Sequence, residues 1–284
     1  MLRELTAIDE QMIDFAWELG KRAETASYPR PSSRAQLLER LQKAVHPDQE
    51  GALGYYAGGL LQGICTYFWD PQERYAQTTL FLLERSGYPQ AADEFTAFLR
   101  DRLGGYELLV GVSAANDAAV SYLQDRGFVC VEASIDTRLA RWRRQTVDQA
   151  IVVEAIGPAS FGEYAAFHDQ HALPLEMYWH SKNIQRELER FRILAVRQGG
   201  EIRASIFART YPGGAEIIGH FAPDGAYAVR EALLQSLLEL LHRGARPPEE
   251  VVYFIDEGSD LELQAALNAG FEINDHYRCY RCIL

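Results

Sequence analysis

The sequence predicts an α/β (α+β) fold of two similar domains, each a mostly antiparallel, twisted mixed sheet flanked by helices. Two repeated features carry this prediction. The stretch NDAAVSYLQDRGF (Asn116–Phe128) has a counterpart in SDLELQAALNAGF (Ser259–Phe271), and each is a polar cap, a helix and a Gly-Phe exit into a strand. A Gly-Gly pair lies between β-rich runs in residues 51–69 and again in residues 192–210, which indicates a hairpin in each half.

The elements around these repeats follow the same order in both halves. A strand and two helices come first, then the hairpin, a further strand, a helix, a strand, the repeated helix and a last strand. In the first half we expect helices at residues 7–23, 32–45 and 91–105 and strands at residues 78–83 and 106–112. In the second half we expect helices at residues 159–172, 181–190 and 228–244 and strands at residues 216–221 and 250–256. Duplication followed by divergence explains this order.

We expect the domains to be residues 1–145 and 146–284, because the run RLARWRRQTVDQ (Arg138–Gln149) separates the two sets of elements. This run is basic within an acidic chain. It is either a linker or final strand whose arginines pair with neighbouring acids, or a strip that binds anions. Charge runs are more often solvated faces, which favours the first interpretation.

Composition excludes several classes of function. The chain has 284 residues and a formal net charge of −12, which disfavours nucleic-acid binding. Four cysteines are few for a disulfide-stapled secreted domain, and no stretch approaches the roughly 20 apolar residues of a membrane span. The first residues lack the basic start and apolar run of a signal peptide. We therefore expect a cytoplasmic protein with no membrane partner, and the oligomeric state stays open.

The repeated unit resembles the GNAT superfamily of acyl-CoA-dependent N-acyltransferases, once in each half. The best match is NDAAVSYLQDRGF, with Asn116 at the helix start, Ala119 three residues later, and Gly127-Phe128 at the exit. The residues agree with this physically, since Asn is a good N-cap and Gly adopts the left-handed exit turn. The resemblance implies two GNAT-like domains, acetyl-CoA as co-substrate and a small-molecule amine as acceptor.

The resemblance also implies a pyrophosphate cradle in each half, between the predicted strand at residues 78–83 or 216–221 and the helix that follows it. The implied cofactor contacts are Phe221, Gly225, Ala226 and Tyr227 in the second half and Gly87 and Asn116 in the first. Both cradles depart from the family pattern, because Pro89 removes a backbone donor and Glu231 would repel phosphate. A capped helix start with no ligand is the alternative for each half.

The family commonly places a proton-donating Tyr four residues before the helix-ending Gly. Here those positions are Leu123 and Ala266, and neither can donate a proton. Tyr122 is adjacent, but one residue turns it about 100° around the helix, so we expect it to be a core or interface aromatic.

Glu216 and His220 are the candidate catalytic bases. Both lie on the predicted strand at residues 216–221, where the family often places such groups, and a spacing of four predicts that both point to one face. The alternative is that His220 is a satisfied, half-buried strand residue. The equivalent strand of the first half offers no comparable pair.

Tyr178, Trp179 and His180 lie between the first two helices of the second half, in a region that shapes the acceptor pocket in the family. We expect them to contact the substrate, or else to form an aromatic lid over the core. We predict no metal site, because the Cys-x-x-Cys at Cys279 and Cys282 has no second pair.

The leading prediction is an acyl-CoA-dependent N-acetyltransferase that acts on a small-molecule amine. The alternative is a catalytically degenerate tandem protein that binds a ligand or a partner. Two altered cradles and two missing tyrosines favour this alternative. The surroundings of Glu216 and His220 discriminate between the two.

Overall fold

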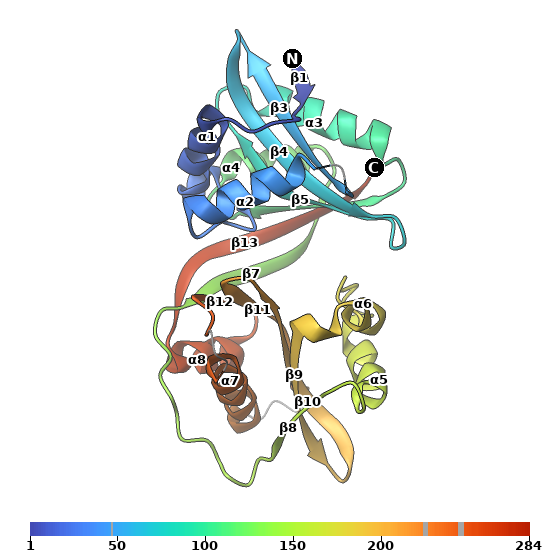
Figure 1. The fold of residues 1–284 in the computed structure, drawn as a ribbon, viewed down its shortest axis with the longest axis vertical. Helices are drawn as coiled ribbons and strands as arrows, with labels where there is room; N and C mark the ends of the chain where they lie inside the picture. The colour runs from blue at the N-terminus through green and yellow to red at the C-terminus, as the bar shows by residue number, and fades with distance from the viewer. Residues whose placement is uncertain (47, 224–226, 244–246) are drawn as a thin grey trace. The chain divides into compact units, whose positions relative to one another are not determined.

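The structure is a computed structural model that describes residues 1–46, 48–223, 227–243 and 247–284. The chain forms two compact units. Unit 1 comprises Met1–Ser134 with Asp275–Leu284, and unit 2 comprises Ile135–Asn274. Each unit is a mixed sheet with helices, as Figure 1 shows, so the predicted fold class is confirmed.

Unit 1 is built on a sheet in the order β1-β3-β4-β5-β6-β13. Its strands are β1 (Leu2–Glu4), β2 (Ser27–Tyr28), β3 (Glu50–Ala57), β4 (Leu60–Asp70), β5 (Tyr75–Leu83) and β6 (Glu107–Ser113). Its helices are α1 (Glu10–Gly20), η1 (Ala23–Thr25), α2 (Arg34–Ala44), α3 (Tyr88–Arg102) and α4 (Asp117–Asp125). Only β5 and β6 pair in parallel along this order. The predicted hairpin is β3–β4, and it turns at Gly58-Gly59, which both have positive φ.

Unit 2 repeats this arrangement in the order β8-β9-β10-β11-β12. Its strands are β8 (Val153–Ala155), β9 (Phe191–Gln198), β10 (Glu201–Tyr211), β11 (Gly214–Phe221) and β12 (Glu250–Asp256). Its helices are α5 (Phe161–Ala172), α6 (Ser181–Arg186), η2 (Leu188–Arg190), α7 (Tyr227–His242) and α8 (Asp260–Ala269). Only β11 and β12 pair in parallel along this order.

Two long strands, β7 (Val129–Leu139) and β13 (Phe271–Ile283), each belong to both units. The second part of β13 pairs with β6 in unit 1, and the Thr137 hydroxyl of β7 donates to the Tyr253 carbonyl in unit 2 at 2.8 Å. The two units are therefore not separated by one boundary between residues 145 and 146, because the last ten residues of the chain belong to unit 1. Local sequence patterns do not show which distant strand a segment will pair with.

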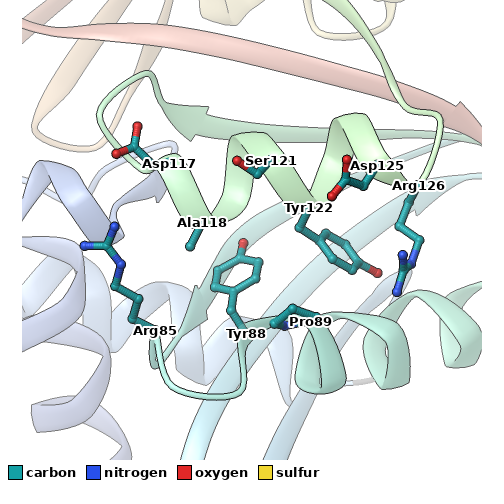
Figure 2. A pocket seen from close by; sticks show the side chains of 9 residues that line it. All are labelled: Arg85, Tyr88, Pro89, Asp117, Ala118, Ser121, Tyr122, Asp125 and Arg126. Atoms are coloured by element: carbon teal, nitrogen blue, oxygen red, sulfur yellow. The ribbon is translucent and has the colours of Figure 1, made fainter.

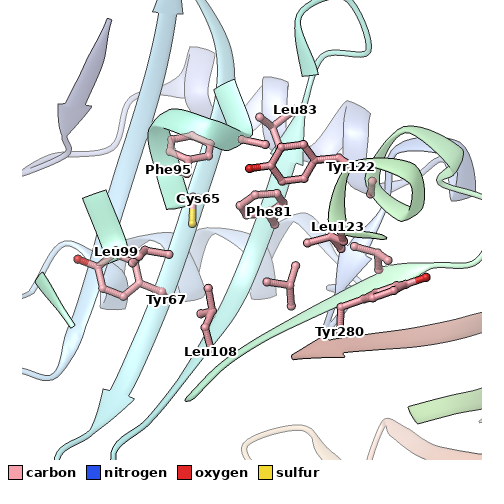
Figure 3. Close-up of a cluster of buried hydrophobic side chains, with 14 of the residues drawn as sticks. Cys65, Tyr67, Phe81, Leu83, Phe95, Leu99, Leu108, Tyr122, Leu123 and Tyr280 are labelled. Atoms are coloured by element: carbon pink, nitrogen blue, oxygen red, sulfur yellow. The ribbon is translucent and has the colours of Figure 1, made fainter. Parts of the chain in front are cut away.

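Each sheet has a core on both faces. In unit 1, α1 and α2 pack on Ile64 and Leu82, whereas α3 and α4 pack on Cys65 and Phe81. Neighbouring strand residues point to opposite faces, so the two clusters lie on opposite sides of the sheet. Figure 3 shows the second cluster, which includes Tyr280 from β13.

The parallel pair opens into a splay in each unit. In unit 1 the pairing of β5 with β6 ends at Gln77, and in unit 2 the pairing of β11 with β12 ends at Ile217. A bulge follows in each case, because the register with β4 skips Thr79 and the register with β10 skips Ile218. A bulge shifts the alternation of side chains by one residue, so it changes which side chains face each side of the splay.

Candidate functional site

Four matched positions beside the splay are polar in unit 2 and apolar in unit 1. The match follows from the bulges and from the helix starts. His220 and Phe81 are each second after the bulged residue. The matched pairs are Phe81 with His220, Ala91 with Arg230, Val110 with Tyr253, and Ala119 with Glu262. The unit 1 members all lie in one buried apolar cluster.

The unit 2 members form a connected chain of polar contacts. His220 Nδ1 lies 3.1 Å from the Tyr253 hydroxyl, and that hydroxyl also contacts a Glu262 carboxylate oxygen. Arg230 pairs with Glu262 at 3.3 Å and donates to the Ala222 carbonyl at 3.0 Å. This series of polar contacts thus links α7, α8, β12 and β11.

His220 is 7% exposed, and its second ring nitrogen, Nε2, has no hydrogen-bond partner among the residues that the structure describes. Burial, with a smaller effect of nearby Arg230, lowers the pKa of His220 to about 3. The ring is therefore neutral at neutral pH. Burial raises the pKa of Glu262, against the opposing effects of Tyr253 and Arg230.

Glu216 does not share a face with His220, so that expectation is wrong. Ala215 and Ile217 pack in the cluster under α7 and α8, which places Glu216, between them, on the opposite face. His220 contacts the α7 and α8 side, because bulged Ile218 shifts the alternation. The sequence spacing of four assumed a regular strand.

Glu216 instead lies on the face that α5 and α6 cover. It pairs across the ladder with Arg209 of β10, and directly opposed side chains project from one face. The Arg209 guanidinium stacks over the Trp179 ring at 4.9 Å and pairs with Glu187 at 2.7 Å. The structure therefore places Glu216 and Trp179, two predicted site residues, beside the same arginine.

The predicted acceptor segment packs on this same face. Trp179 contacts Phe191 with ring centroids 5.2 Å apart, and its carbonyl lies 2.8 Å from His168 Nε2. Tyr178 packs edge-on against Trp179, and His180 is the N-cap residue of α6. The segment is thus an aromatic cover over part of the core as well as a border of the Glu216 face.

The predicted cofactor contacts of unit 2 divide between the two faces. Phe221 stacks on His171 at 5.2 Å, on the α5 side. The Tyr227 hydroxyl donates to Glu231 at 3.2 Å and accepts from Asn268 at 2.8 Å, between α7 and α8. Gly225 and Ala226 lie outside the described residues.

Unit 1 has a pocket of about 440 Å³ between the start of α3 and α4. Figure 2 shows its lining, which consists of Arg85, Tyr88, Pro89, Asp117, Ala118, Ser121, Tyr122, Asp125 and Arg126. Gly87, the N-cap residue of α3, has a φ of 96° and precedes Tyr88 of this lining. The buried Tyr88 hydroxyl has no hydrogen-bond partner among the described residues. The pocket thus joins a helix N-terminus to an unsatisfied polar group.

The splay of unit 1 is filled by the chain itself. Ser27 and Tyr28 of β2 pair with β6, and the Ser27 hydroxyl accepts the Phe81 amide at 2.8 Å. The Asn116 side chain accepts the Ala119 amide and donates to the Ala26 carbonyl, both at 3.2 Å. Asn116, a predicted cofactor contact, thus acts as a helix cap and as an anchor for this segment.

No family model and no curated protein matches the sequence. Solved structures do match. A GCN5-related N-acetyltransferase from Sphaerobacter thermophilus has a TM-score of 0.67 at 13% identity, over 99% of this chain and 95% of that chain. A tandem GNAT protein from the clavulanic acid biosynthesis pathway has a TM-score of 0.61 at 15% identity, over 99% and 98%. The fold is GNAT-like.

A third match is a putative acetyltransferase from Pyrococcus horikoshii, with a TM-score of 0.55 at 13% identity, over 100% of this chain and 89% of that chain. The predicted GNAT resemblance is confirmed for the fold over nearly the whole chain. At these identities the matches establish the fold alone.

The two positions where the GNAT resemblance implies a proton-donating Tyr are buried and apolar, Leu123 and Ala266. Tyr122 is a core aromatic, as predicted, and its hydroxyl donates to Asp93 at 3.0 Å. Sequence reasoning missed Arg209, Arg230 and the Tyr253–Glu262 contact. A position-by-position comparison of the two halves would have singled out Glu262, which replaces Ala119 inside the repeated motif.

Neither metal ligation nor a membrane helix has support in the part of the chain that the structure describes. In residues 1–46, 48–223, 227–243 and 247–284, no cluster of three or more His, Cys, Asp or Glu side chains could hold a metal ion. No helix in these ranges is long and apolar enough to cross a membrane. Cys279 is a buried free thiol and Cys282 is a half-buried one.

Proposed function

We propose that the protein is an acyl-CoA-dependent N-acetyltransferase that transfers an acetyl group from acetyl-CoA to a small-molecule amine in unit 2, with Glu216 as the base. One observation carries this proposal. Glu216 lies one residue before the end of the parallel pairing, at the vertex of the splay, on the face bordered by Trp179. The matched position in unit 1 is Gln77, which cannot accept a proton from an amine.

The reaction needs a base on the acceptor side of the sheet. The amine nitrogen attacks the thioester carbonyl carbon, the new C–N bond forms, the C–S bond breaks, and the nitrogen loses a proton. A carboxylate within hydrogen-bond reach of that nitrogen accelerates the step by about 10²–10⁴-fold. Glu216 has the chemistry for this role, whereas His220 lies on the other face and burial keeps its pKa at about 3.

The aromatic and charged groups around Glu216 favour a compact amine. Trp179 offers a ring face, to which an aminium group binds by cation–π attraction. Arg209 already occupies one side of this ring and pairs with Glu187. We propose that Tyr178, Trp179 and His180 border the acceptor, and that the donor lies on the α7 and α8 side, at the start of α7 near Tyr227.

Calorimetric titration with acetyl-CoA, followed by a mass-spectrometric screen of an amine panel, tests the proposal. We expect micromolar binding, about −8 kcal/mol, and acetylation of a subset of amines. Glu216→Gln should keep acetyl-CoA binding and lose about 10²–10⁴-fold in kcat. The matched control, Gln77→Glu in unit 1, should leave kcat unchanged. Absence of binding up to millimolar acetyl-CoA would overturn the proposal.

A second candidate function, ligand binding without transfer, is favoured for unit 1. Its pocket adjoins the N-terminus of α3, which favours an anionic group such as a phosphate, and Arg85 adds a positive charge. Asp117 and Asp125 in the same lining oppose it. The Ser27 segment fills the adjoining splay, so a ligand held here does not reach between the strands.

The number of CoA molecules bound per chain tests this second candidate. Ala118→Trp should fill the unit 1 pocket, and it should remove one binding equivalent while amine acetylation continues. If Ala118→Trp changes neither stoichiometry nor affinity, unit 1 does not bind the ligand.

A further inference from the structure

We propose that Glu262, Tyr253 and His220 form a proton relay that delivers a proton to the thiolate released when the acetyl group is transferred. This inference rests on the proposed function. A thioester that loses its acyl group to an amine leaves a thiolate, and the GNAT-like positions that could hold a proton-donating Tyr are Leu123 and Ala266 here. The relay lies on the α7 and α8 side of the sheet, opposite the Glu216 face.

The fold does not require these polar groups. Phe81, Ala91, Val110 and Ala119 occupy the same four positions in unit 1, and all are at most 2% exposed. Buried polar and charged groups lose hydration that an apolar core does not forfeit. Unit 1 shows that the backbone accepts the apolar solution, so the polar set in unit 2 has a role other than holding the fold.

The hydrogen-bond geometry allows two proton arrangements. Tyr253 has one hydroxyl proton and two neighbours that can accept it, His220 Nδ1 and Glu262. In the donor arrangement Glu262 is protonated and donates to the Tyr253 oxygen, the Tyr253 hydroxyl donates to Nδ1, and His220 carries its proton on Nε2. In the spent arrangement Tyr253 donates to the Glu262 carboxylate, and His220 carries its proton on Nδ1.

One delivered proton converts the donor arrangement into the spent one. The Nε2 proton of His220 moves to the sulfur, Nδ1 takes the proton of Tyr253, and the Tyr253 oxygen takes the proton of Glu262. The sulfur becomes a thiol, Glu262 becomes a carboxylate, and the ring and the phenol stay neutral throughout. The Nε2 atom that starts this transfer is buried and has no partner within the described residues.

The groups around Glu262 fit a proton reservoir. Its burial raises the pKa of the carboxyl, which favours the protonated form. Arg230 from α7 pairs with the carboxylate that remains after delivery, and Asp256 from β12 opposes ionisation. The Glu262 side chain is 12% exposed, so water can return the proton.

Nitrogen NMR of the ¹⁵N-histidine-labelled full chain tests the relay without any turnover. His220 is assigned from its absence in His220→Phe. In the wild type, we expect the proton of His220 to move from Nε2 to Nδ1 as rising pH ionises Glu262. In Glu262→Gln the amide donates to the Tyr253 oxygen permanently, so His220 should stay protonated on Nε2 at every pH. An identical tautomer in both proteins from low to high pH would overturn the relay.

Donors with different leaving groups test the delivery step. Tyr253→Phe and Glu262→Gln should lower kcat with acetyl-CoA by about 10²-fold. Both should lose far less with the acetyl ester of seleno-coenzyme A, because a selenolate needs protonation less than a thiolate does. Tyr280→Phe is the control, since it removes a partly buried hydroxyl that accepts a hydrogen bond from Gln124 in unit 1.

The outcomes separate the two proposals. A wild-type protein that acetylates no amine with either donor overturns the proposed function and the relay with it. An active wild type whose variants lose equally with both donors overturns the relay alone. Thermal unfolding of each variant identifies one that has not folded, in which case the remaining relay variant decides the question.

Discussion

Unit 1 and unit 2 share the same order of elements, the same bulge and the same splay, but they fill the splay differently. In unit 1 the Ala26–Tyr28 segment lies against β6, and the neighbouring side chains are apolar. In unit 2 the matched side chains form a network of polar contacts that runs from Arg230 through Glu262 and Tyr253 to His220. The vertex residue also changes, from Gln77 to Glu216.

This difference separates what the fold needs from what a function needs. Unit 1 serves as an internal reference for unit 2, because its Phe81 and Ala119 show which side chains the same backbone tolerates. The pocket between α3 and α4 lies in unit 1, whereas the connected ionisable groups lie in unit 2. Substitutions that exchange residues between the units measure this division directly.

The largest effect is expected from breaking the buried ion pair. At a pH where Glu262 is ionised, Glu262→Ala leaves the largely buried Arg230 charge without a carboxylate, and we expect a loss of about 3–5 kcal/mol in the free energy of unfolding. The double variant Arg230→Ala/Glu262→Ala recreates Ala91 and Ala119 of unit 1 and should recover most of that loss. Urea unfolding measures both.

An exposed pair provides the control for this prediction. Glu10→Ala breaks a contact of Glu10 with Arg34 at the surface, and it should cost about 0–1 kcal/mol. A double variant no more stable than Glu262→Ala would contradict the view that the buried charge is the cause.

The two glycines that end the repeated helices should respond differently to alanine. Gly127 has a φ of 78° and open space around the added methyl group, so Gly127→Ala should cost about 1–2 kcal/mol for the left-handed backbone. Gly270 has a φ of 101°, and its Cβ would lie 1.9 Å from the Arg141 carbonyl oxygen. Gly270→Ala should therefore cost about 3 kcal/mol or more. Equal shifts in the urea midpoint would show that the backbone near Arg141 yields freely.

The hydrogen bond from the Phe81 amide to the Ser27 hydroxyl holds the segment that fills the splay of unit 1. Ser27→Ala removes the acceptor of the buried Phe81 amide, and an unpaired buried amide costs about 1–3 kcal/mol. Ser32→Ala, which removes an exposed bond to Gln36, should change stability by less than about 0.5 kcal/mol. Hydrogen exchange at Phe81 should rise in the first variant only. Unchanged exchange at Phe81 would mean that Ser27 does not hold the segment in place.

Local pattern was sufficient to predict the repeat, because Asn116, Gly127 and Gly270 determine their own caps and turns. The order of elements followed from the periodicity between them. The exchange of β7 and β13 between units was beyond prediction, since the partner of a strand is decided by residues distant in the chain.

Only some members of the candidate site were singled out from the sequence, and their arrangement was not predicted. Glu216, His220 and Trp179 were singled out by residue type and place. The bulge at Ile218 places Glu216 and His220 on opposite faces of the sheet. A bulge of this kind cannot be predicted from the residue types in the strand. Tyr253 and Glu262 were missed because a buried polar residue looks like any other until its matched apolar position is known.

The last expected effect is a pH dependence of stability that comes from His220. The pKa of this ring is about 3 in the folded protein and about 6.5 when the chain is unfolded. The unfolded chain therefore binds an extra proton between these values, so stability falls as pH drops from about 6.5 towards 3, by about 1.4 kcal/mol per pH unit.

Replacing His220 by Phe, the residue at the matched position 81 of unit 1, should remove the contribution of His220 to this pH dependence. His220→Phe cannot bind the proton, so its unfolding free energy should depend less steeply on pH between 6 and 4 than that of the wild type. His168 contributes in the same direction, because burial lowers its pKa too, and a slope should therefore remain. Urea unfolding across this range measures the difference. Parallel curves would mean that His220 is already protonated in the folded protein, and the relay would then lose its neutral imidazole.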